Sequence, residues 1–337
     1  MSDFLDKLNT YYKEKKINDK YYKILKNFYF SFEKALQNSS IKKEAYNQSF
    51  DILIDLILSQ FISPYKFENY HKKIFSPFNY YEYGKKIVSF LLDKENSKIF
   101  GEENLELISK YLKNNENVIL LSNHQTEVDP QVIDILLEDK YPKIAKDIIF
   151  VAGNRVVTDP VAIPFSMGCN LLCIFSKKYI DQDPNSQHQK QIYNRKTMNV
   201  MKNLLSKGSK IIYVAPSGGR DRKDDNDNIE IAPFDPNSIE MFYFMAKKAK
   251  TPTHFFALTL YTYDLMPPPK KTQTEMGEER VVNRKNAILS FSKEIDMEKI
   301  KGSMELDKKQ RRKKRSDSIY KMVTEEFNKI IRGNNDS

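Results

Sequence analysis

The segment from Asn123 to Pro130, NHQTEVDP, places a histidine five residues before a carboxylate. Histidine is the side chain best suited to proton transfer at neutral pH, and this chain has only 4 of them. A regular helix would point His124 and Asp129 about 140° apart. A loop that turns between them would instead fold the carboxylate back onto the imidazole, and the other ring nitrogen could then take a proton from an alcohol.

The hydroxyl that such a base would activate belongs to the substrate, because the chain contains no Gly-x-Ser-x-Gly turn that would present an enzyme serine. An alternative interpretation stays open from the pattern alone. His-x4-Asp arises often by chance, and Asp129 could be only the N-cap of a helix that begins at Pro130.

The surrounding residues place this pair at the end of a strand. Residues 117 to 121 form a short apolar run of strand type, and apolar residues recur at helical spacing from Val132 to Leu137. His124 is therefore expected at the carboxyl end of a strand, which is the edge at which open α/β sheets bind their ligands.

Two further groups of residues follow predicted strands. Gly218 and Gly219 precede Arg220 and Arg222, and two adjacent glycines predict a tight turn or a close approach to a ligand. The two guanidinium forks suit phosphate oxygens, although they could equally pair on a surface turn with nearby acidic residues, namely Asp221, Asp224 or Asp225.

The second group is Lys177, Lys178 and Tyr179, which follow the predicted strand 171 to 175. Adjacent lysines are common on surfaces. Placed at the same edge as the histidine and the arginines, however, they predict a pocket for a phosphorylated alcohol.

Alternating helical and strand patterns predict an α/β fold with a mainly parallel mixed sheet flanked by helices on both faces. The expected strands lie at residues 117 to 121, 148 to 152, 171 to 175, 210 to 215, 254 to 260 and 287 to 291. Residues 1 to 77 show no strand pattern, and we expect a small helical-bundle domain there, followed by a catalytic domain over residues 78 to 337. The apolar stripes on the helices of residues 1 to 77 are interpreted as core, with a lipid-binding surface as the alternative.

The composition restricts the class of protein. The chain has 337 residues and a mass of 39.6 kDa, and no apolar run approaches the roughly 20 residues that span a bilayer. The amino end reads neither as a signal peptide nor as a transit peptide. Cys169 and Cys173 lack partners at metal-ligand spacing and are interpreted as reduced packing residues, and without a nucleotide fingerprint or acidic cluster we expect no metal and no cofactor.

The net charge of +10 predicts attraction to something anionic. The densest basic run, residues 308 to 315, is expected on a solvated helix face, with a binding patch as the alternative. A nucleic-acid-binding protein would also explain the charge, but the chain shows neither zinc spacing nor an aromatic RNA-binding motif, so no nucleic-acid partner is expected.

Several blocks together resemble those of the soluble, plastid-type glycerol-3-phosphate acyltransferases. In family order they are NHQTEVDP (123 to 130), VAGNRVVTDP (151 to 160), PFSMG (164 to 168), SKK (176 to 178), APSGGRDR (215 to 222), APFD (232 to 235) and DLMPPP (264 to 269). The resemblance covers about 150 residues. An acyltransferase acting on a lysophospholipid is the alternative within enzymes, and the paired arginines disfavour it.

The resemblance implies transfer of a fatty acyl chain from acyl carrier protein or acyl-coenzyme A to the sn-1 hydroxyl of glycerol 3-phosphate. His124 would be the general base and Asp129 would orient it, with no covalent acyl-enzyme. The residues implied to hold the phosphate are Lys178, Arg220, Arg222 and Lys177, with support from Tyr179, Gly218 and Gly219. The family usually has a histidine where Tyr179 stands. A tyrosine at this position can donate a hydrogen bond but brings no positive charge.

The resemblance also implies a place of action for the protein. It would work as a soluble enzyme of the stroma of a plastid or apicoplast-like organelle, without a transmembrane segment and with at most a peripheral membrane contact for its lysophosphatidate product. A cleaved presequence would leave no trace in this chain.

Overall fold

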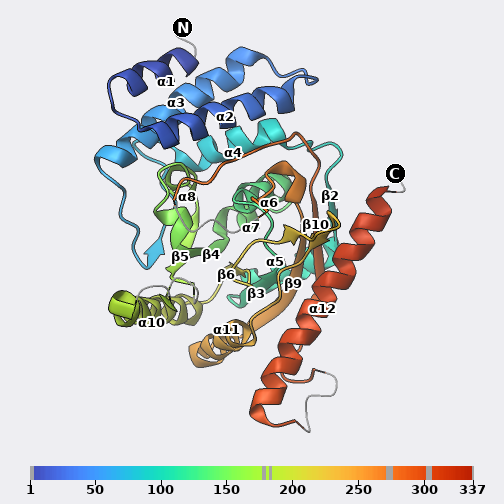
Figure 1. The fold of residues 1–337 in the computed structure, drawn as a ribbon. Coiled ribbons are helices and arrows are strands. Elements are labelled where there is room, and N and C mark those ends of the chain that lie inside the picture. Colours follow the sequence, from blue (N-terminus) through green and yellow to red (C-terminus); the bar gives the residue numbers. More distant parts are fainter. Residues whose placement is uncertain (1–3, 177–179, 182–183, 271–275, 301–305, 336–337) are drawn as a thin grey trace.

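The computed structural model describes the whole chain except residues 1–3, 177–179, 182–183, 271–275, 301–305 and 336–337 (Figure 1). In chain order the elements before the middle of the sheet are α1 (Phe4–Lys13), α2 (Asp19–Leu36), α3 (Lys43–Ile62), β1 (Tyr70–His71), α4 (Tyr80–Leu91), β2 (Lys98–Phe100), α5 (Glu102–Lys113), β3 (Asn117–Ser122), α6 (Asp129–Leu137) and α7 (Pro142–Asp147). The remaining elements are β4 (Ile149–Gly153), η1 (Asn154–Val157), α8 (Ile163–Ser166), β5 (Asn170–Ile174), α10 (Pro184–Ser206), β6 (Ile211–Val214), β7 (Arg222–Lys223), β8 (Ile229–Glu230), α11 (Pro236–Ala249), β9 (Thr253–Tyr261), η2 (Tyr263–Leu265), β10 (Ile288–Glu294) and α12 (Lys308–Asn335).

The main sheet has eight strands in the order β1-β5-β4-β6-β3-β9-β10-β2. Strands β5, β4, β6, β3 and β9 are parallel to one another. Strand β1 runs antiparallel to β5, β10 runs antiparallel to β9, and β2 is parallel to β10. The predicted mainly parallel mixed sheet is confirmed. Because five successive strands run the same way, their carboxyl ends meet at one edge of the sheet.

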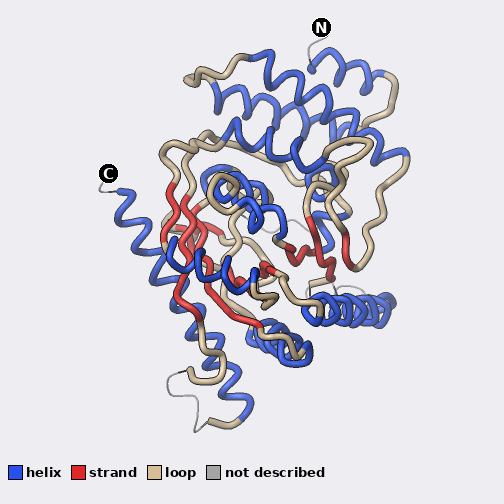
Figure 2. The backbone as a smooth tube through the Cα atoms, turned by 180° about the vertical axis from the view of Figure 1, so that it is seen from behind, coloured by secondary structure: helices blue, strands red, loops and turns tan. Residues whose placement is uncertain are grey.

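Helices cover both faces of this sheet, as predicted. Alternate residues of β3 point to opposite faces and belong to two different cores. Val118 and Leu120 pack into the core on the side of α1 to α7. Ile119 and Leu121 pack into a second core with residues of α10, α11 and α12. The strand is buried throughout, which explains its unbroken apolar pattern. Figure 2 shows the helices on either side of the strands from behind.

The amino-terminal helices form a layer above one face of the sheet (Figure 1). Helix α2 begins with Asn18 as its N-cap, whose side chain accepts a hydrogen bond from the Tyr21 N–H. Aromatic rings fill the space between α1, α2 and α3, with Phe50 in contact with Phe4, Tyr29 and Phe32. This core is continuous with the core under the sheet. The division into two domains near residue 77 remains a prediction.

Residues 1 to 77 do contain a strand, contrary to the sequence-based expectation. Tyr70 and His71 form β1, which pairs antiparallel with Leu172 and Leu171 of β5. His71 also lies with its Nε2 atom 3.2 Å from the Met167 carbonyl. Two residues are too short for an alternating pattern, and this pairing exists because the outer edge of β5 leaves backbone groups to be satisfied.

Gly168 allows the turn before β5 to lie against the start of α4. A Cβ atom added there would lie 2.5 Å from the carbonyl oxygen of Tyr80, and backbone cannot move aside as a flexible side chain can. We expect Gly168→Ala to lower the free energy of unfolding by about 1–3 kcal/mol in urea denaturation.

Gly153→Ala is the matched control for this substitution. A Cβ atom at Gly153 would meet nothing within 4 Å, and its φ of −73° is one that alanine adopts freely. Its free energy of unfolding should stay within about 0.5 kcal/mol of the wild type. Equal stability of the two variants would contradict this account of Gly168.

Candidate active site

The loop after β3 folds back so that His124 meets Asp129. The imidazole Nδ1 atom lies 2.8 Å from Asp129 Oδ2. A carboxylate can only accept here, so Nδ1 carries the hydrogen in the neutral ring and Nε2 keeps its lone pair. The His124 side chain is 29% exposed and the Asp129 side chain only 1%. The arrangement can therefore offer Nε2 as a base to a bound hydroxyl.

The Asp129 carboxylate is held by several donors besides the histidine. The backbone N–H groups of Gln125 and Thr126 donate to it at 2.9 Å and 3.2 Å, and the Thr262 hydroxyl donates at 2.6 Å. The expectation that Asp129 caps α6 is wrong: Val128 occupies the N-cap position and Asp129 is the first helical residue. The Asp129 side chain turns back towards the loop and accepts hydrogen bonds from the N–H groups of Gln125 and Thr126. These N–H groups precede the helix, so the hydrogen bonds of its backbone do not include them.

Three loops at this edge of the sheet are joined by a buried amide and carboxylate frame. Gln125 Oε1 accepts from the backbone N–H groups of Thr262 and Tyr263 after β9, at 2.7 Å and 3.0 Å. Asn123 and Gln125 both donate to Asp221 Oδ2, at 2.9 Å and 3.2 Å. The Asp221 N–H donates to the His124 carbonyl at 2.7 Å. The position of His124 is thus set by residues from the ends of β3, β6 and β9.

The predicted glycine turn after β6 is present. Gly218 has a φ of +64°, which glycine adopts without strain, and its N–H donates to the Ala215 carbonyl at 3.1 Å. A Cβ atom at Gly218 or Gly219 would meet nothing within 4 Å. The need for Gly218 is therefore conformational, and the space beside the turn is open.

The two arginines after this turn have different partners. Arg220 Nη2 donates to both oxygens of Glu278, at 2.6 Å and 2.8 Å. Arg222 donates only to backbone carbonyls in the described part of the chain, those of Pro269 at 3.3 Å and Arg220 at 3.0 Å. Burial lowers the pKa of Arg222, and repulsion by Arg220 lowers it further. Arg222 is thus a cation whose charge no described carboxylate neutralises by direct contact, which favours an anionic ligand.

The alternative pairing of these arginines with Asp221, Asp224 or Asp225 is not what the structure has. Asp221 is fully buried and faces the amides of Asn123 and Gln125. Asp224 accepts hydrogen bonds from Asn226 and Asn228 within its own turn. Instead, Arg220 is paired with a carboxylate 58 residues away.

A second set of charged residues lies beside the His124 loop, and the sequence-based interpretation assigned it no role. Arg280 is buried and donates to Glu127 at 2.8 Å, to Asp159 at 3.3 Å and to the Glu278 carbonyl at 2.9 Å. Burial alone would raise the pKa of Glu127, but Arg280 and then Arg220 hold that pKa below its ordinary value. Glu127 and Asp159 lie within the recognised blocks, whereas no motif marks Glu278 or Arg280.

The predicted phosphate-binding residues Lys177, Lys178 and Tyr179 lie outside the described residues. The strand that leads to them, β5, ends at Ile174 on the same edge of the sheet as β6 and β3. Their predicted role stays a prediction.

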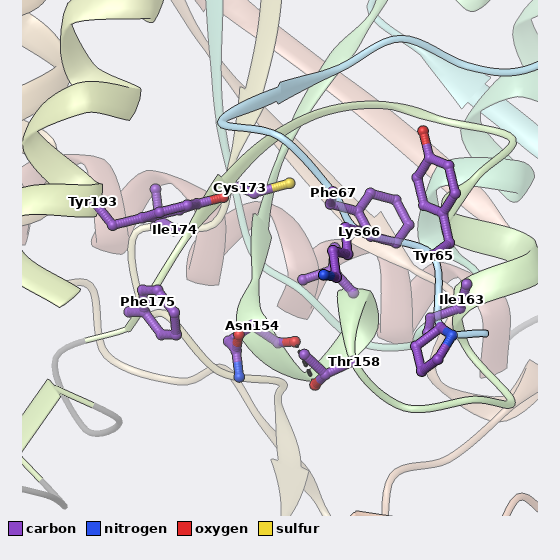
Figure 3. Close-up of a pocket in the computed structure, with 12 residues that line it drawn as sticks. Tyr65, Lys66, Phe67, Asn154, Thr158, Ile163, Cys173, Ile174, Phe175 and Tyr193 are labelled. Carbon is purple, nitrogen blue, oxygen red and sulfur yellow. Dashed lines mark hydrogen bonds between the residues drawn. The ribbon is translucent and has the colours of Figure 1, made fainter. Parts of the chain in front are cut away.

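An apolar cavity of about 360 Å³ opens at the carboxyl ends of β4 and β5 (Figure 3). Side chains converge on it from the segment after α3, from η1, from the end of β5 and from α10; they include Tyr65, Phe67, Val157, Ile163, Ile174, Phe175 and Tyr193. Cys173 also lines it, and burial raises the pKa of its thiol to about 12. The cavity can accept a hydrocarbon chain, and its cysteine stays a neutral thiol.

Comparison with known proteins relates this geometry to a family. Residues 101–257 match the family model described as Acyltransferase. The chain is similar to the chloroplastic glycerol-3-phosphate acyltransferase of Arabidopsis thaliana, with 33% identity over 306 residues, which are 90% of this chain and 66% of that protein. A chloroplastic enzyme of the same name from Cucurbita moschata is 38% identical over 250 residues, 74% of this chain and 54% of that protein.

Over nine tenths of its own length, the chain is thus similar to a glycerol-3-phosphate acyltransferase. It spans slightly less than two thirds of the A. thaliana relative and about half of the C. moschata relative. The residues matched by the family model include the histidine and aspartate of the β3 loop and the two arginines after β6. The charged residues Glu278 and Arg280 lie beyond it.

None of the helices among the described residues combines the length and the apolar character that crossing a membrane requires. Within the same residues, no cluster of three or more His, Cys, Asp or Glu side chains is arranged to hold a metal ion.

The buried Asp221 predicts a specific dependence of stability on pH. Burial raises its pKa to about 6, although the hydrogen bonds from Ala232, Asn123 and Gln125 oppose the shift. In the unfolded chain the ordinary value is about 3.9, so between these values the folded protein binds more protons than the unfolded one. This residue therefore makes stability fall as pH rises from about 4 to about 6.

Asp221→Asn cannot titrate and should lack this component. The free energy of unfolding of the wild type, relative to that of the variant, should fall by up to about 3 kcal/mol between pH 4 and pH 6 in urea denaturation. Asp225→Asn, on the exposed turn, controls for the loss of one carboxylate. Parallel curves for the wild type and Asp221→Asn would contradict the shift.

Proposed function

We propose that this protein transfers a fatty acyl group from a thioester donor to the sn-1 hydroxyl of glycerol 3-phosphate, giving lysophosphatidate. The observation that carries the proposal is the His124–Asp129 contact of 2.8 Å at the sheet edge that also holds Arg220 and Arg222. A base without an enzyme nucleophile needs a substrate hydroxyl, and Arg222, which no carboxylate among the described residues contacts, favours an anion. Glycerol 3-phosphate supplies both groups.

In the proposed mechanism, Nε2 of His124 takes the proton of the sn-1 hydroxyl as the oxygen attacks the thioester carbonyl carbon. The carbonyl oxygen becomes a transient oxyanion, and then the carbon–sulfur bond breaks. The departing thiolate receives the proton from His124, which returns the ring to its starting state. Asp129 stabilises the imidazolium between these steps without itself being protonated.

The phosphate of the substrate would be held by Arg220 and Arg222, with Lys178 and Lys177 as further cations and with Tyr179, Gly218 and Gly219 as supporting residues. The acyl chain would occupy the cavity between η1, β5 and α10. This cavity opens at the same edge of the sheet as the His124 loop, so the carbonyl end of the chain would face that edge.

The proposed donor is acyl carrier protein or acyl-coenzyme A. Both are anionic, and the net charge of +10 would steer either one towards the protein. Since the relatives of this chain are named chloroplastic, we propose that it acts in the stroma of a plastid or of an apicoplast-like organelle.

An assay of thiol release tests the function. Purified protein should release free thiol from acyl-acyl carrier protein or acyl-coenzyme A only when glycerol 3-phosphate is present, and the product should be 1-acyl-glycerol 3-phosphate. Thiol release that is indifferent to glycerol 3-phosphate, or that depends on lysophosphatidate as acceptor, would overturn the proposal.

His124→Ala should retain less than about a hundredth of the wild-type kcat, because general-base assistance contributes typically 10² to 10⁴ in rate. Circular dichroism and the melting temperature should show a folded protein. His188→Ala, on the exposed part of α10, is the matched control and should keep its kcat. Near-normal turnover of His124→Ala would remove His124 from the mechanism.

Arg222→Gln should raise KM for glycerol 3-phosphate by about tenfold to a hundredfold while kcat stays within about threefold, because a charged hydrogen bond to phosphate is lost. Arg222 is a cleaner test than Arg220, whose loss would remove the 2.6 Å ion pair of the buried Glu278. Arg332→Gln, on the exposed end of α12, should leave KM unchanged. An unchanged KM in Arg222→Gln would argue against a phosphate at this position.

A further inference from the structure

Arg155 lies at the edge of the sheet where the proposed substrate binds. It belongs to η1, which follows β4 directly, and β4 lies between β5 and β6 in the sheet. Because these strands are parallel, the carboxyl end of β4 is adjacent to that of β6, from which Arg220 and Arg222 follow. Pattern reasoning assigned Arg155 no role, although it lies within one of the recognised blocks.

Arg155 and Arg220 contact the same carboxylate. Arg155 Nη2 lies 3.5 Å from Glu278 Oε2, and Arg220 Nη2 lies 2.6 Å from Glu278 Oε1. A single carboxylate therefore brings two guanidinium groups together. The Glu278 side chain is only 4% exposed and its carbonyl accepts from Arg280 Nη1, so this bridging group is fixed in position.

Arg222 brings to this cluster a positive charge that no described carboxylate neutralises by direct contact. Four arginines (Arg155, Arg220, Arg222 and Arg280) lie among three carboxylates (Glu127, Asp159 and Glu278). Arg280 uses two of these carboxylates in its own contacts. Glu278 contacts both Arg155 and Arg220, and Arg220 also lies 3.9 Å from Glu127.

The exposure of the arginines separates those that could touch a ligand from the one that could not. The side chains of Arg155 and Arg220 are 20% and 12% exposed, whereas that of Arg280 is 4% exposed. Arg155 also acts on Arg222. Burial lowers the pKa of Arg222 most, repulsion by Arg220 lowers it further, and repulsion by Arg155 makes a smaller contribution in the same direction. The positive charges of Arg155 and Arg220 are thus partly open to solvent.

The short helix that carries Arg155 also borders the apolar cavity. Asn154, Val157 and Thr158 line the cavity, and Figure 3 shows Asn154 and Thr158 beside it. Helix η1 and its C-cap Thr158 thus border the cavity proposed for the acyl chain. The same helix contributes Arg155 to the arginine cluster proposed for the phosphate. Arg155 lies where the two substrates would meet.

We propose that Arg155 is a third arginine of the phosphate site, held beside Arg220 by the Glu278 carboxylate. The inference rests on the proposed function, because it assigns one more residue to the same acceptor substrate. Phosphate oxygens would supply the negative charge that Arg222 lacks among its described contacts, and they could bind the partly exposed guanidinium groups of Arg155 and Arg220, because a guanidinium can bind two such oxygens at once.

Steady-state kinetics of Arg155→Gln test this assignment. KM for glycerol 3-phosphate should rise by about tenfold to a hundredfold, kcat should stay within about threefold, and KM for the acyl donor should not change. Inorganic phosphate, used as a competitive inhibitor, should lose affinity by a similar factor. Arg155→Lys keeps the charge without the fork and should lie between Arg155→Gln and the wild type.

Arg284→Gln is the matched control, because Arg284 is a partly exposed arginine that pairs with Asp93 at 3.7 Å outside this cluster. It should leave KM and phosphate inhibition unchanged. Melting temperatures of all variants separate loss of binding from loss of folding, and Arg155→Lys serves if Arg155→Gln does not fold. A lowered melting temperature with unchanged KM and unchanged phosphate inhibition would make Arg155 a structural partner of Glu278 and overturn the inference.

The outcome for Arg222→Gln distinguishes the failure of this inference from that of the proposed function. If Arg222→Gln raises KM and Arg155→Gln does not, only the assignment of Arg155 fails. If neither changes KM, or if the wild type does not acylate glycerol 3-phosphate, the proposed phosphate site itself is wrong.

Discussion

The buried carboxylate of Asp129 is the constraint on which the site depends. A carboxylate that is 1% exposed is stable only when its oxygens accept enough hydrogen bonds to replace water. Here the donors are the amides of Gln125 and Thr126, the Thr262 hydroxyl and the His124 ring. Satisfying this one group therefore determines the path of the loop, the tautomer of the histidine and the position of β9 relative to the loop.

The same principle extends to the loop ends around it. Asn123 and Gln125 each use both ends of their amide groups, donating to Asp221 and accepting from backbone N–H groups of the β9 end. The buried tyrosine Tyr213 donates to the Asn123 carbonyl at 2.8 Å. Side chains that satisfy one another inside the protein resist displacement, because each broken contact would leave a buried polar group unpaired. The outcome is a firmly held support for the partly exposed imidazole of His124.

The arginines around this support divide into structural and accessible groups. Arg280 is buried and joins the His124 loop to the segment after Gly277 through Glu127 and Asp159. Arg155, Arg220 and Arg222 lie nearer to solvent at the ends of β4 and β6. Parallel strands make this arrangement possible, because their carboxyl ends bring segments that are far apart in sequence to one edge of the sheet. A mainly apolar cavity beside cationic residues is consistent with the proposed reaction between an acyl chain and a phosphorylated alcohol.

The sequence by itself determined the features that depend on local pattern. The periodicity of apolar residues predicted the main strands and the helices between them, and the order of strands and helices predicted a mainly parallel sheet. Residue type and spacing also brought His124, Asp129, Arg220 and Arg222 forward as candidates. The carboxyl ends of parallel strands meet at one edge, so these residues could be placed together before any coordinates were known.

Only the tertiary structure decided which charges meet. The pairing of Arg220 with Glu278 joins residues 58 positions apart, and that of Glu127 with Arg280 joins residues 153 apart. No periodicity records such a contact, because it depends on how separate loops pack at the edge of the sheet. The sequence suggested neighbouring aspartates as partners for the arginines, and burial of Asp221 in the amide frame excluded that pairing. Local patterns specify elements, whereas burial and distance between elements specify the electrostatics of the site.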